Sequence, residues 1–375
     1  MMQLRLITSA LVRHRRPVGY WVCLEIIALY IPVCAIAFWL WVNPSLLGNT
    51  SQHIAADSST YIYMADVLRN RSADPTVYAA MAHFPNTLWM PVGIAYVLNS
   101  TGLTVLFNVG ILCLSLILIH RSVDLDSPYL LLLLLLNPTT VISLLSVNKE
   151  IMDLLEVSCF CCFLSRRSRL CLVSALILAL LNRYEVLICF VLFLAMRSRL
   201  NPWRGRRWLS LLLLLCGFTI LLPLSASHVL AEKFAEAEGG GVVTFLDQLE
   251  MHFLFIFAAV PKIAENFFGE LLNPATIARY TFEDLANSYI LLLNNLATAL
   301  VVVKLWMMGR FRLRSIQSDL MYLAAITSIV MSISLVIQPR YFYIVYVLLC
   351  IEATRRRQRD AIQVPPPLTP ALSGT

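Results

Sequence analysis

Long apolar runs recur along most of the chain, and short polar segments rich in Lys and Arg separate them. A helix needs about 20 mostly apolar residues to cross a hydrocarbon layer of ~30 Å. The runs therefore predict an all-α, polytopic membrane protein with about ten transmembrane helices. Their expected limits are 18–42, 102–119, 128–146, 150–164, 170–182, 184–196, 208–227, 286–307, 319–337 and 340–353.

Two long segments, 43–102 and 228–284, do not fit this pattern and are expected to be loops on the outer face. The first holds a polar, helix-like stretch at 57–70 and a semi-apolar stretch at 88–98 that is too short to cross alone. The second holds an apolar stretch at 245–268 that charges interrupt. Both loops are predicted to contain interfacial helices that lie on the membrane surface.

Three consecutive predicted spans, 150–164, 170–182 and 184–196, are shorter than a full crossing requires. We expect their outer ends to stop below the membrane surface and to leave a depression there. The inner halves of the spans are almost purely apolar, which argues against a polar transport path. The residues expected to line the depression are Asn148, Lys149, Glu150, Asn182, Arg183, Tyr184 and Glu185.

Composition and charge agree with a membrane protein. Hydrophobic residues make up 59% of the 375 positions, charged residues 14%, and the mean hydropathy is +0.75. Soluble domains have about 45–50% apolar residues, so a soluble fold is excluded. Residues 1–360 are expected to form one transmembrane domain, and the Pro-rich segment 361–375 a disordered cytoplasmic tail.

The net charge of +7 is explained by the positions of the cations, so no nucleic-acid partner is expected. With the N-terminus in the cytoplasm, 21 of the 29 Lys and Arg fall on the cytoplasmic side, as the positive-inside rule requires. Both termini are then cytoplasmic. The expected location is a bacterial inner membrane, with the active site on the periplasmic face.

Three of the cations left on the outer side, Lys149, Arg183 and Arg340, lie at the outer ends of predicted spans. A charge at membrane depth costs at least about 2.5–3.5 kcal/mol, so it persists where it is paired or used. Arg340 opens the last span after Pro339, where a helix N-terminus also favours an anion such as phosphate. Inter-helix ion pairs and snorkelling interfacial anchors are the alternative interpretations.

Asp57 follows Ala55 and Ala56 early in the first outer loop, and Ser58 follows it. An Asp in this context also suits the N-cap of a helix. The ten cysteines lie in apolar segments, and no His stands at metal-ligand spacing from them. They are interpreted as small buried hydrophobic residues, and neither a metal site nor another cofactor is expected.

Several short motifs resemble the GT-C superfamily of membrane glycosyltransferases, and in particular its bacterial exopolysaccharide-cluster transferases and polymerases. The resemblance covers the layout of roughly residues 1–350. The motifs are Asp57-Ser58-x-x-Tyr61-x-x-x-Ala65, Pro85 with Pro91-Val92-Gly93, Asn137-Pro138 with Asn148-Lys149-Glu150, and Gln338-Pro339-Arg340-Tyr341.

The resemblance implies an enzyme that moves a sugar from a polyprenyl-phosphate-linked donor to a glycan or lipid-linked acceptor outside the cytoplasm. In such enzymes the loop acid is the general base, which corresponds to Asp57. Basic residues stabilise the leaving phosphate, which corresponds to Arg340, Lys149 and Arg183. The expected reaction is a single displacement with inversion at the anomeric carbon.

The remaining candidates would support this reaction. Glu150 and Glu185 would orient the cations, and Tyr341 and His83 would contact substrate. Some relatives carry two acids in the first loop, whereas Ala55 and Ala56 precede Asp57 here. The resemblance therefore gives no support for a divalent metal.

Other functions remain open from the sequence. An exopolysaccharide or O-antigen type of polymerase or ligase would use the same donor class and would also need a cationic outer site. A lipid-glycan transporter and a non-catalytic assembly subunit belong to other functional classes.

Overall fold

The structure is a computed structural model, and it describes residues 16–41, 56–72, 74–82, 87–225, 249, 252–272, 282–311, 316–333 and 339–356. Within these ranges the regular elements are helices, and the described part contains no strand, only one isolated β-bridge between Leu125 and Arg355. The all-α prediction is therefore confirmed. Predicted features at His83, at 228–248 and at 361–375 lie outside the described residues.

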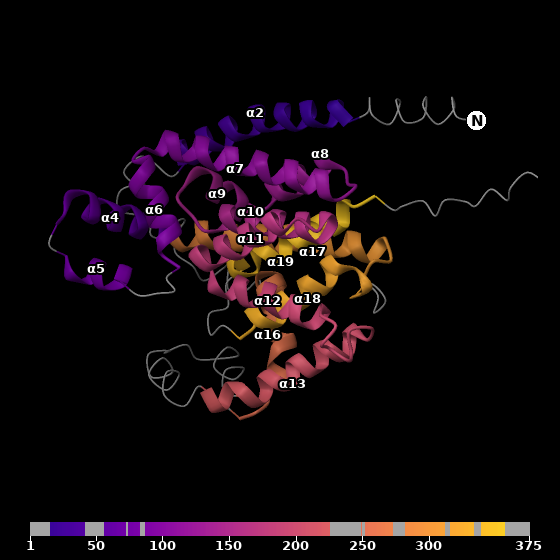
Figure 1. Ribbon diagram of the computed structural model, residues 1–375. Helices are drawn as coiled ribbons and strands as arrows, with labels where there is room; N and C mark the ends of the chain where they lie inside the picture. Colours follow the sequence, from indigo (N-terminus) through magenta and orange to yellow (C-terminus); the bar gives the residue numbers. More distant parts are fainter. Residues whose placement is uncertain are drawn as a thin grey trace, which may run out of the picture.

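Each predicted span coincides with a helix or with a pair of helical elements, and most of the ends agree closely with the prediction. In chain order the elements are α2 (Arg16–Trp41), α4 (Ala56–Asn70), α5 (Pro75–Ala82), α6 (Trp89–Leu98), α7 (Thr101–Ser122), α8 (Ser127–Leu136), α9 (Pro138–Leu145), α10 (Glu150–Arg166), α11 (Arg169–Asn182), α12 (Tyr184–Arg197), α13 (Arg207–Ser225), α16 (Phe255–Leu272), α17 (Phe282–Met307), α18 (Asp319–Met331), the 3-10 helix η3 (Pro339–Phe342) and α19 (Tyr343–Thr354) (Figure 1).

The prediction of one straight helix over 128–146 is wrong. Helices α8 and α9 meet there at a bend of 86°. Pro138 has no N–H to continue α8 and begins α9 instead. The preceding Asn137 has extended backbone angles, φ −85° and ψ 118°, and its side-chain Oδ1 accepts a hydrogen bond of 2.9 Å from the Thr139 N–H.

Two other predicted spans also differ from the structure. The span predicted at 319–337 ends earlier, because α18 stops at Met331 and a turn follows. The last span begins with the 3-10 turn η3, so that Arg340 precedes α19 instead of lying in it. The helix expected within 245–268 is α16, which packs against α13 and α17. Its Lys262 is fully buried, so this helix is more deeply packed than a surface helix would be.

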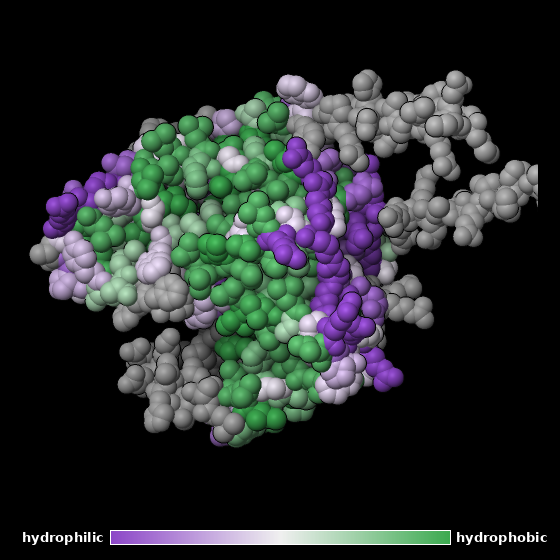
Figure 2. All heavy atoms as spheres, viewed as in Figure 1, coloured by the Kyte–Doolittle hydropathy of each residue, from purple (hydrophilic) through white to green (hydrophobic). Residues whose placement is uncertain are grey.

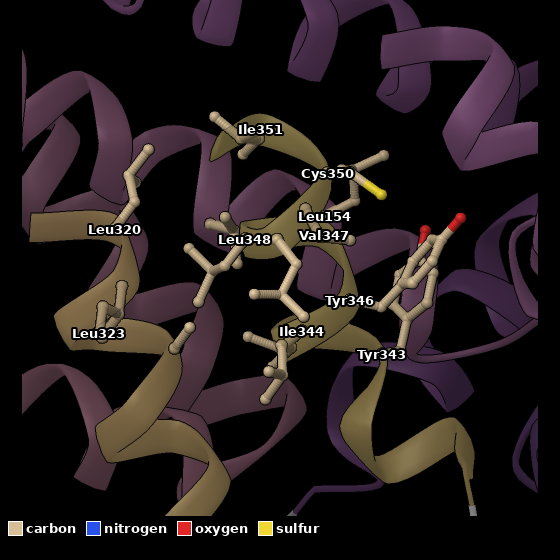
Figure 3. Close-up of a cluster of buried hydrophobic side chains, with 14 of the residues drawn as sticks. Leu154, Leu320, Leu323, Tyr343, Ile344, Tyr346, Val347, Leu348, Cys350 and Ile351 are labelled. Carbon is tan, nitrogen blue, oxygen red and sulfur yellow. The ribbon is translucent and has the colours of Figure 1, made fainter. Parts of the chain in front are cut away.

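Helices α10 and α19 form the centre of the bundle. Every residue of α19 from Tyr343 to Thr354 is buried, and α19 packs against α18, α10, α17 and α8. Figure 3 shows its aliphatic side chains between Leu154 of α10 and Leu320 of α18, while the hydroxyls of Tyr343 and Tyr346 point together to one side. Tyr343 shares a hydrogen bond of 3.0 Å with Thr140 of α9.

A broad apolar band lies between two hydrophilic ends of the bundle (Figure 2). At the right of this view the basic segments meet one another. Arg166 donates to the Arg121 carbonyl, Arg207 pairs with Asp319 at 2.6 Å, and Arg310 donates to the Glu352 carbonyl. Among the described residues, the basic segments that the charge pattern assigns to one side are thus together at one end of the molecule.

The opposite end carries α4, α5 and α6 (Figure 1). A small apolar cluster holds α4 and α6 together, with Tyr61, Ala65, Val92 and Ala95 buried in it. Arg69 of α4 donates to the carbonyls of Ala95 and Tyr96, which lie near the end of α6. Since these carbonyls belong to the last turn of a helix, the Arg69 guanidinium is a favourable partner for them.

Among the described helices, one is long and apolar enough by itself to cross a membrane, the part of α7 from Gly102 to Ser122. The bent pair α8–α9 passes the same test when it is counted as one span. The other apolar helical stretches are 10–17 residues long over the described residues, for example Trp21–Cys34 in α2 and Leu291–Met307 in α17. The helices are therefore established, whereas the ten-span arrangement stays a prediction.

Candidate functional site

An ion pair joins two predicted site residues that are 283 positions apart in the sequence. Arg340 Nη1 lies 2.8 Å from Asp57 Oδ2, and both side chains are partly exposed, Asp57 to 39% and Arg340 to 30%. Asp57 lies in the first turn of α4, where the helix dipole also favours a carboxylate. Its side chain is thus engaged by Arg340 and reachable from solvent.

Tyr341 connects Arg340 to the second predicted cation. The Cζ atoms of Arg340 and Arg183 lie 5.5 Å and 5.4 Å from the centre of the Tyr341 ring. Both distances are within the range of cation–π attraction. The electron-rich ring is thus shared by two guanidinium groups that would otherwise only repel one another.

Arg183 is buried in the one-residue link between α11 and α12. Its extended backbone, with φ −149° and ψ 105°, ends one helix and begins the next. Arg183 Nη2 lies 2.6 Å from Glu150 Oε1, and Arg183 Nε lies 3.3 Å from Asp153 Oδ2. Because removing one partner of a buried pair leaves an uncompensated charge, these two acids are what hold Arg183 in place.

Lys149 directly precedes α10, and its Nζ lies 5.8 Å from the centre of the Tyr61 ring. Burial lowers the pKa of Lys149, and the positive charge of Arg183 lowers it further. Burial also raises the pKa of Tyr61, with a smaller contribution from the carboxylate of Asp57. The positive charge on Lys149 is therefore harder to maintain than on an exposed lysine.

Hydrogen bonds to the 146–149 loop fix it against its neighbours. The Val147 N–H donates to Ser58 Oγ at 3.2 Å, which ties the loop to α4. Asn108 of α7 donates to the carbonyls of Ser143 and Ser146, both at 2.9 Å. Asn182 Nδ2 donates to the Lys149 carbonyl at 3.1 Å. The loop that carries Lys149 is thus held by three different helices.

The structure brings together most of the residues predicted from the sequence, but not in one open depression. Asp57, Arg340 and Lys149 are accessible in part, whereas Glu150 and Arg183 are buried beneath them. Glu185 is partly buried and adds negative charge near Arg183, without an ion pair between them in the part that the structure describes. His83 lies outside the described residues.

The sequence interpretation missed two acids, Asp153 and Glu156, which are fully buried on α10. Both lie in the outer half of the span predicted at 150–164, about one and two helical turns below Glu150. The signal was present, because Glu150, Asp153 and Glu156 follow one another at three-residue spacing, which puts them on one helix face. The sequence does not show that Glu150 and Asp153 pair with Arg183, which lies in the link between α11 and α12.

No metal site emerges from the residues that the structure describes, where no group of three or more His, Cys, Asp or Glu is placed to hold an ion. All ten cysteines are free thiols, and most of them are buried or partly buried. The chemically distinctive feature of this end is instead an accessible carboxylate beside three basic side chains.

Comparisons of the chain with protein-family models, with curated proteins and with solved structures give no match.

Proposed function

We propose that the chain is a membrane glycosyltransferase that moves a sugar from a polyprenyl-phosphate-linked donor to a glycan or lipid-linked acceptor on the non-cytoplasmic face. The observation that carries the proposal is the Asp57–Arg340 pair of 2.8 Å, at the end of the bundle that also holds Lys149 and Arg183. A transferase of this kind needs a base for the acceptor hydroxyl and cations for the departing phosphate. The pair supplies one of each.

In the proposed reaction the acceptor oxygen attacks the anomeric carbon while the bond from that carbon to the phosphate oxygen breaks. The hydroxyl proton passes to Asp57, and the negative charge that develops on the phosphate is stabilised by Arg340 and Lys149. A single displacement of this kind inverts the anomeric configuration. Arg183 lies deeper, and we propose that it contributes positive charge from beneath Tyr341.

The pairing of Asp57 with Arg340 suggests an order of events. A phosphate that binds Arg340 competes with the Asp57 carboxylate for the guanidinium. Donor binding would therefore release Asp57 for proton transfer. This order would keep the base engaged until a donor is present.

The proposal is tested in cells that lack the protein and are complemented with variants, by analysis of the extracted lipid-linked glycans. We expect Asp57→Asn to leave an intermediate that lacks one sugar, because the amide cannot accept the proton. Asp66→Asn is the matched control, since Asp66 is on the same helix and pairs with Arg69 at 2.7 Å. It should restore the complete glycan.

Complete glycan in cells that carry Asp57→Asn, at the level of the wild type, would refute the base assignment. A complete but unpolymerised repeat unit in cells without the protein would instead indicate a polymerase. A variant chain that is absent from the membrane fraction is replaced by Asp57→Ser, which tests the same loss of the carboxylate.

A further inference from the structure

Helix α10 carries a row of acids from its outer end into the centre of the bundle. Glu150, Asp153 and Glu156 are spaced three residues apart and are exposed to only 2%, 0% and 0%. Buried carboxylates are rare unless they are paired or hydrogen-bonded. Each of the three therefore calls for its own partner.

The outer two acids share one cation. Glu150 and Asp153 both pair with Arg183, and Asp153 Oδ1 also accepts a hydrogen bond of 2.8 Å from Asn182 Nδ2. Two carboxylates thus share one guanidinium, and Lys149 is the other cation near them. The positive charge of Arg183 is thus committed before Glu156 is considered.

Glu156 lies beside the Asn182 amide, one helical turn deeper than Asp153. Neither of its carboxyl oxygens accepts a hydrogen bond from the described part of the chain, and the same is true of Asn182 Oδ1. The Asn182 NH2 group is already used, because it donates to Asp153 and to the Lys149 carbonyl. Turning the amide over would set its oxygen against those two acceptors, so its orientation is fixed.

Neighbouring acceptors without a donor are a costly arrangement inside a protein. A carboxylate has only acceptor atoms, whereas a protonated carboxyl group has one O–H to donate. A proton on Glu156 supplies the missing donor and at the same time removes a third buried negative charge.

We propose that Glu156 carries a proton and is a positioning residue, which donates its O–H to the neighbouring Asn182 side chain and so fixes Asp153 and Arg183 beneath the anion site. The chain of contacts runs from Glu156 to Asn182, from Asn182 to Asp153, and from Asp153 to Arg183. The link between this positioning role and anion binding rests on the proposed function. The presence of a proton on Glu156 does not depend on that function.

The surroundings of Glu156 support this assignment. The charged or titratable groups that face it are Asp153 and Cys159 on α10 itself and Arg183 after α11. Helices α7, α9 and α19 also pack against α10. Within the described residues, they bring no charged side chain next to Glu156. Arg183 is the one cation nearby, and it is held by the other two acids.

The proton is tested directly by infrared spectroscopy of the full-length protein in detergent. A protonated carboxyl group has its own C=O stretching band, which an ionised carboxylate lacks. We expect the difference between the wild type and Glu156→Gln to show the loss of such a band. Glu352→Gln is the matched control, because Glu352 is buried but pairs with Arg310 and Arg355. A spectrum in which Glu156→Gln removes only carboxylate bands would overturn the proposal.

The positioning role is tested by the binding of sulfate, which resembles phosphate but keeps its charge from about pH 6 to about pH 9. Glu156→Gln mimics the protonated acid, so it should bind sulfate as the wild type does near pH 6 and should lose less affinity as the pH rises. Glu156→Ala removes the donor and should bind roughly tenfold more weakly at every pH. Equal pH profiles for the wild type and Glu156→Gln would contradict the role.

Two further outcomes separate the proposals. If the wild type binds no sulfate, the anion site fails, and the infrared result still decides whether Glu156 carries a proton. A bound metal ion in place of the proton is tested by measuring thermal stability in Na⁺ and again with Na⁺ replaced by a large organic cation. A thermal stability that depends on Na⁺ in the wild type but not in Glu156→Gln would overturn the protonated form.

Discussion

Asp57 and Arg340 neutralise one another across 283 positions of the chain. Their exposure means that water and salt screen the pair, so it contributes little to stability. Its consequence concerns ligands instead, because an anion that binds Arg340 competes with a carboxylate that is already there. The role that we propose for each residue depends on this competition.

Asp57→Asn is therefore expected to strengthen anion binding even though it abolishes transfer. Removing the competing charge should raise the affinity for sulfate by about two- to fivefold, the range expected for a partly exposed ion pair. Equilibrium dialysis of the purified full chain with labelled sulfate measures the change at low ionic strength, where the effect is largest.

Asp66→Asn again serves as the control, since it breaks a similar ion pair with Arg69 on the same helix. It should leave sulfate binding unchanged. An affinity that falls in Asp57→Asn would mean that Asp57 holds Arg340 in its binding position and does not compete with the anion.

The sequence could place Asp57, Lys149, Arg183 and Arg340 at one end of the molecule, because the alternation of charge along the chain carries that information. It could not show that Arg340 forms an ion pair with Asp57. Nor could it show that Arg183 pairs with Glu150 and Asp153. Those choices depend on distances of a few ångströms between helices that are far apart in the sequence. No local pattern encodes them.

At the scale of elements, the apolar runs predicted the helices well but not where they break. Asn137-Pro138 gives a local signal that was overlooked, since a proline cannot continue the helix before it. The early end of α18 has no such signal in the printed sequence. The 86° bend between α8 and α9 has a consequence for the site, because it turns α9 so that Ser143 and the following loop reach α7 and α10.

The junction between α4 and α5 depends on one partly exposed carboxylate. Asp74 accepts hydrogen bonds from the Thr76 hydroxyl at 2.6 Å, from the Thr76 N–H at 3.0 Å and from the Tyr63 hydroxyl at 2.7 Å. It thus caps the start of α5 and ties it to α4. The Thr76 hydroxyl, and then the Tyr63 hydroxyl, lower the pKa of Asp74 to about 2.

This lowered pKa predicts an acid-sensitive junction. A carboxylate whose pKa is lower in the folded state stabilises the fold above its unfolded pKa of about 4, and the contribution is lost as the pH falls towards 2. Hydrogen exchange of the α5 amides, corrected for intrinsic rates, should therefore show protection that decreases over this interval. Asp74→Asn should have low protection throughout and little change with pH. The same acid dependence in both proteins would contradict the assignment.

At the scale of the whole molecule, the membrane orientation that the sequence predicts stays a prediction, and the arrangement of charge shows how to test it. The apolar band in Figure 2 separates a strongly basic end from the end that holds Asp57 and Arg340. A membrane potential and anionic cytoplasmic lipids both favour the basic end inside. The helices that the structure establishes are compatible with this orientation, and a direct experiment decides it.

Two single cysteines would report which end faces the cytoplasm. Ser72 is exposed beyond the end of α4, and Gly205 is exposed between α12 and α13, with no atom within 4 Å of an added Cβ. We expect a membrane-impermeant maleimide to label Ser72→Cys in intact spheroplasts and Gly205→Cys only after permeabilisation. The parent chain is the control for the native thiols, of which Cys216 is exposed. Labelling of both variants in intact spheroplasts would refute the opposed orientation of the two ends. It would also remove the reason for assigning a polyprenyl-linked donor, since nucleotide sugars are confined to the cytoplasm.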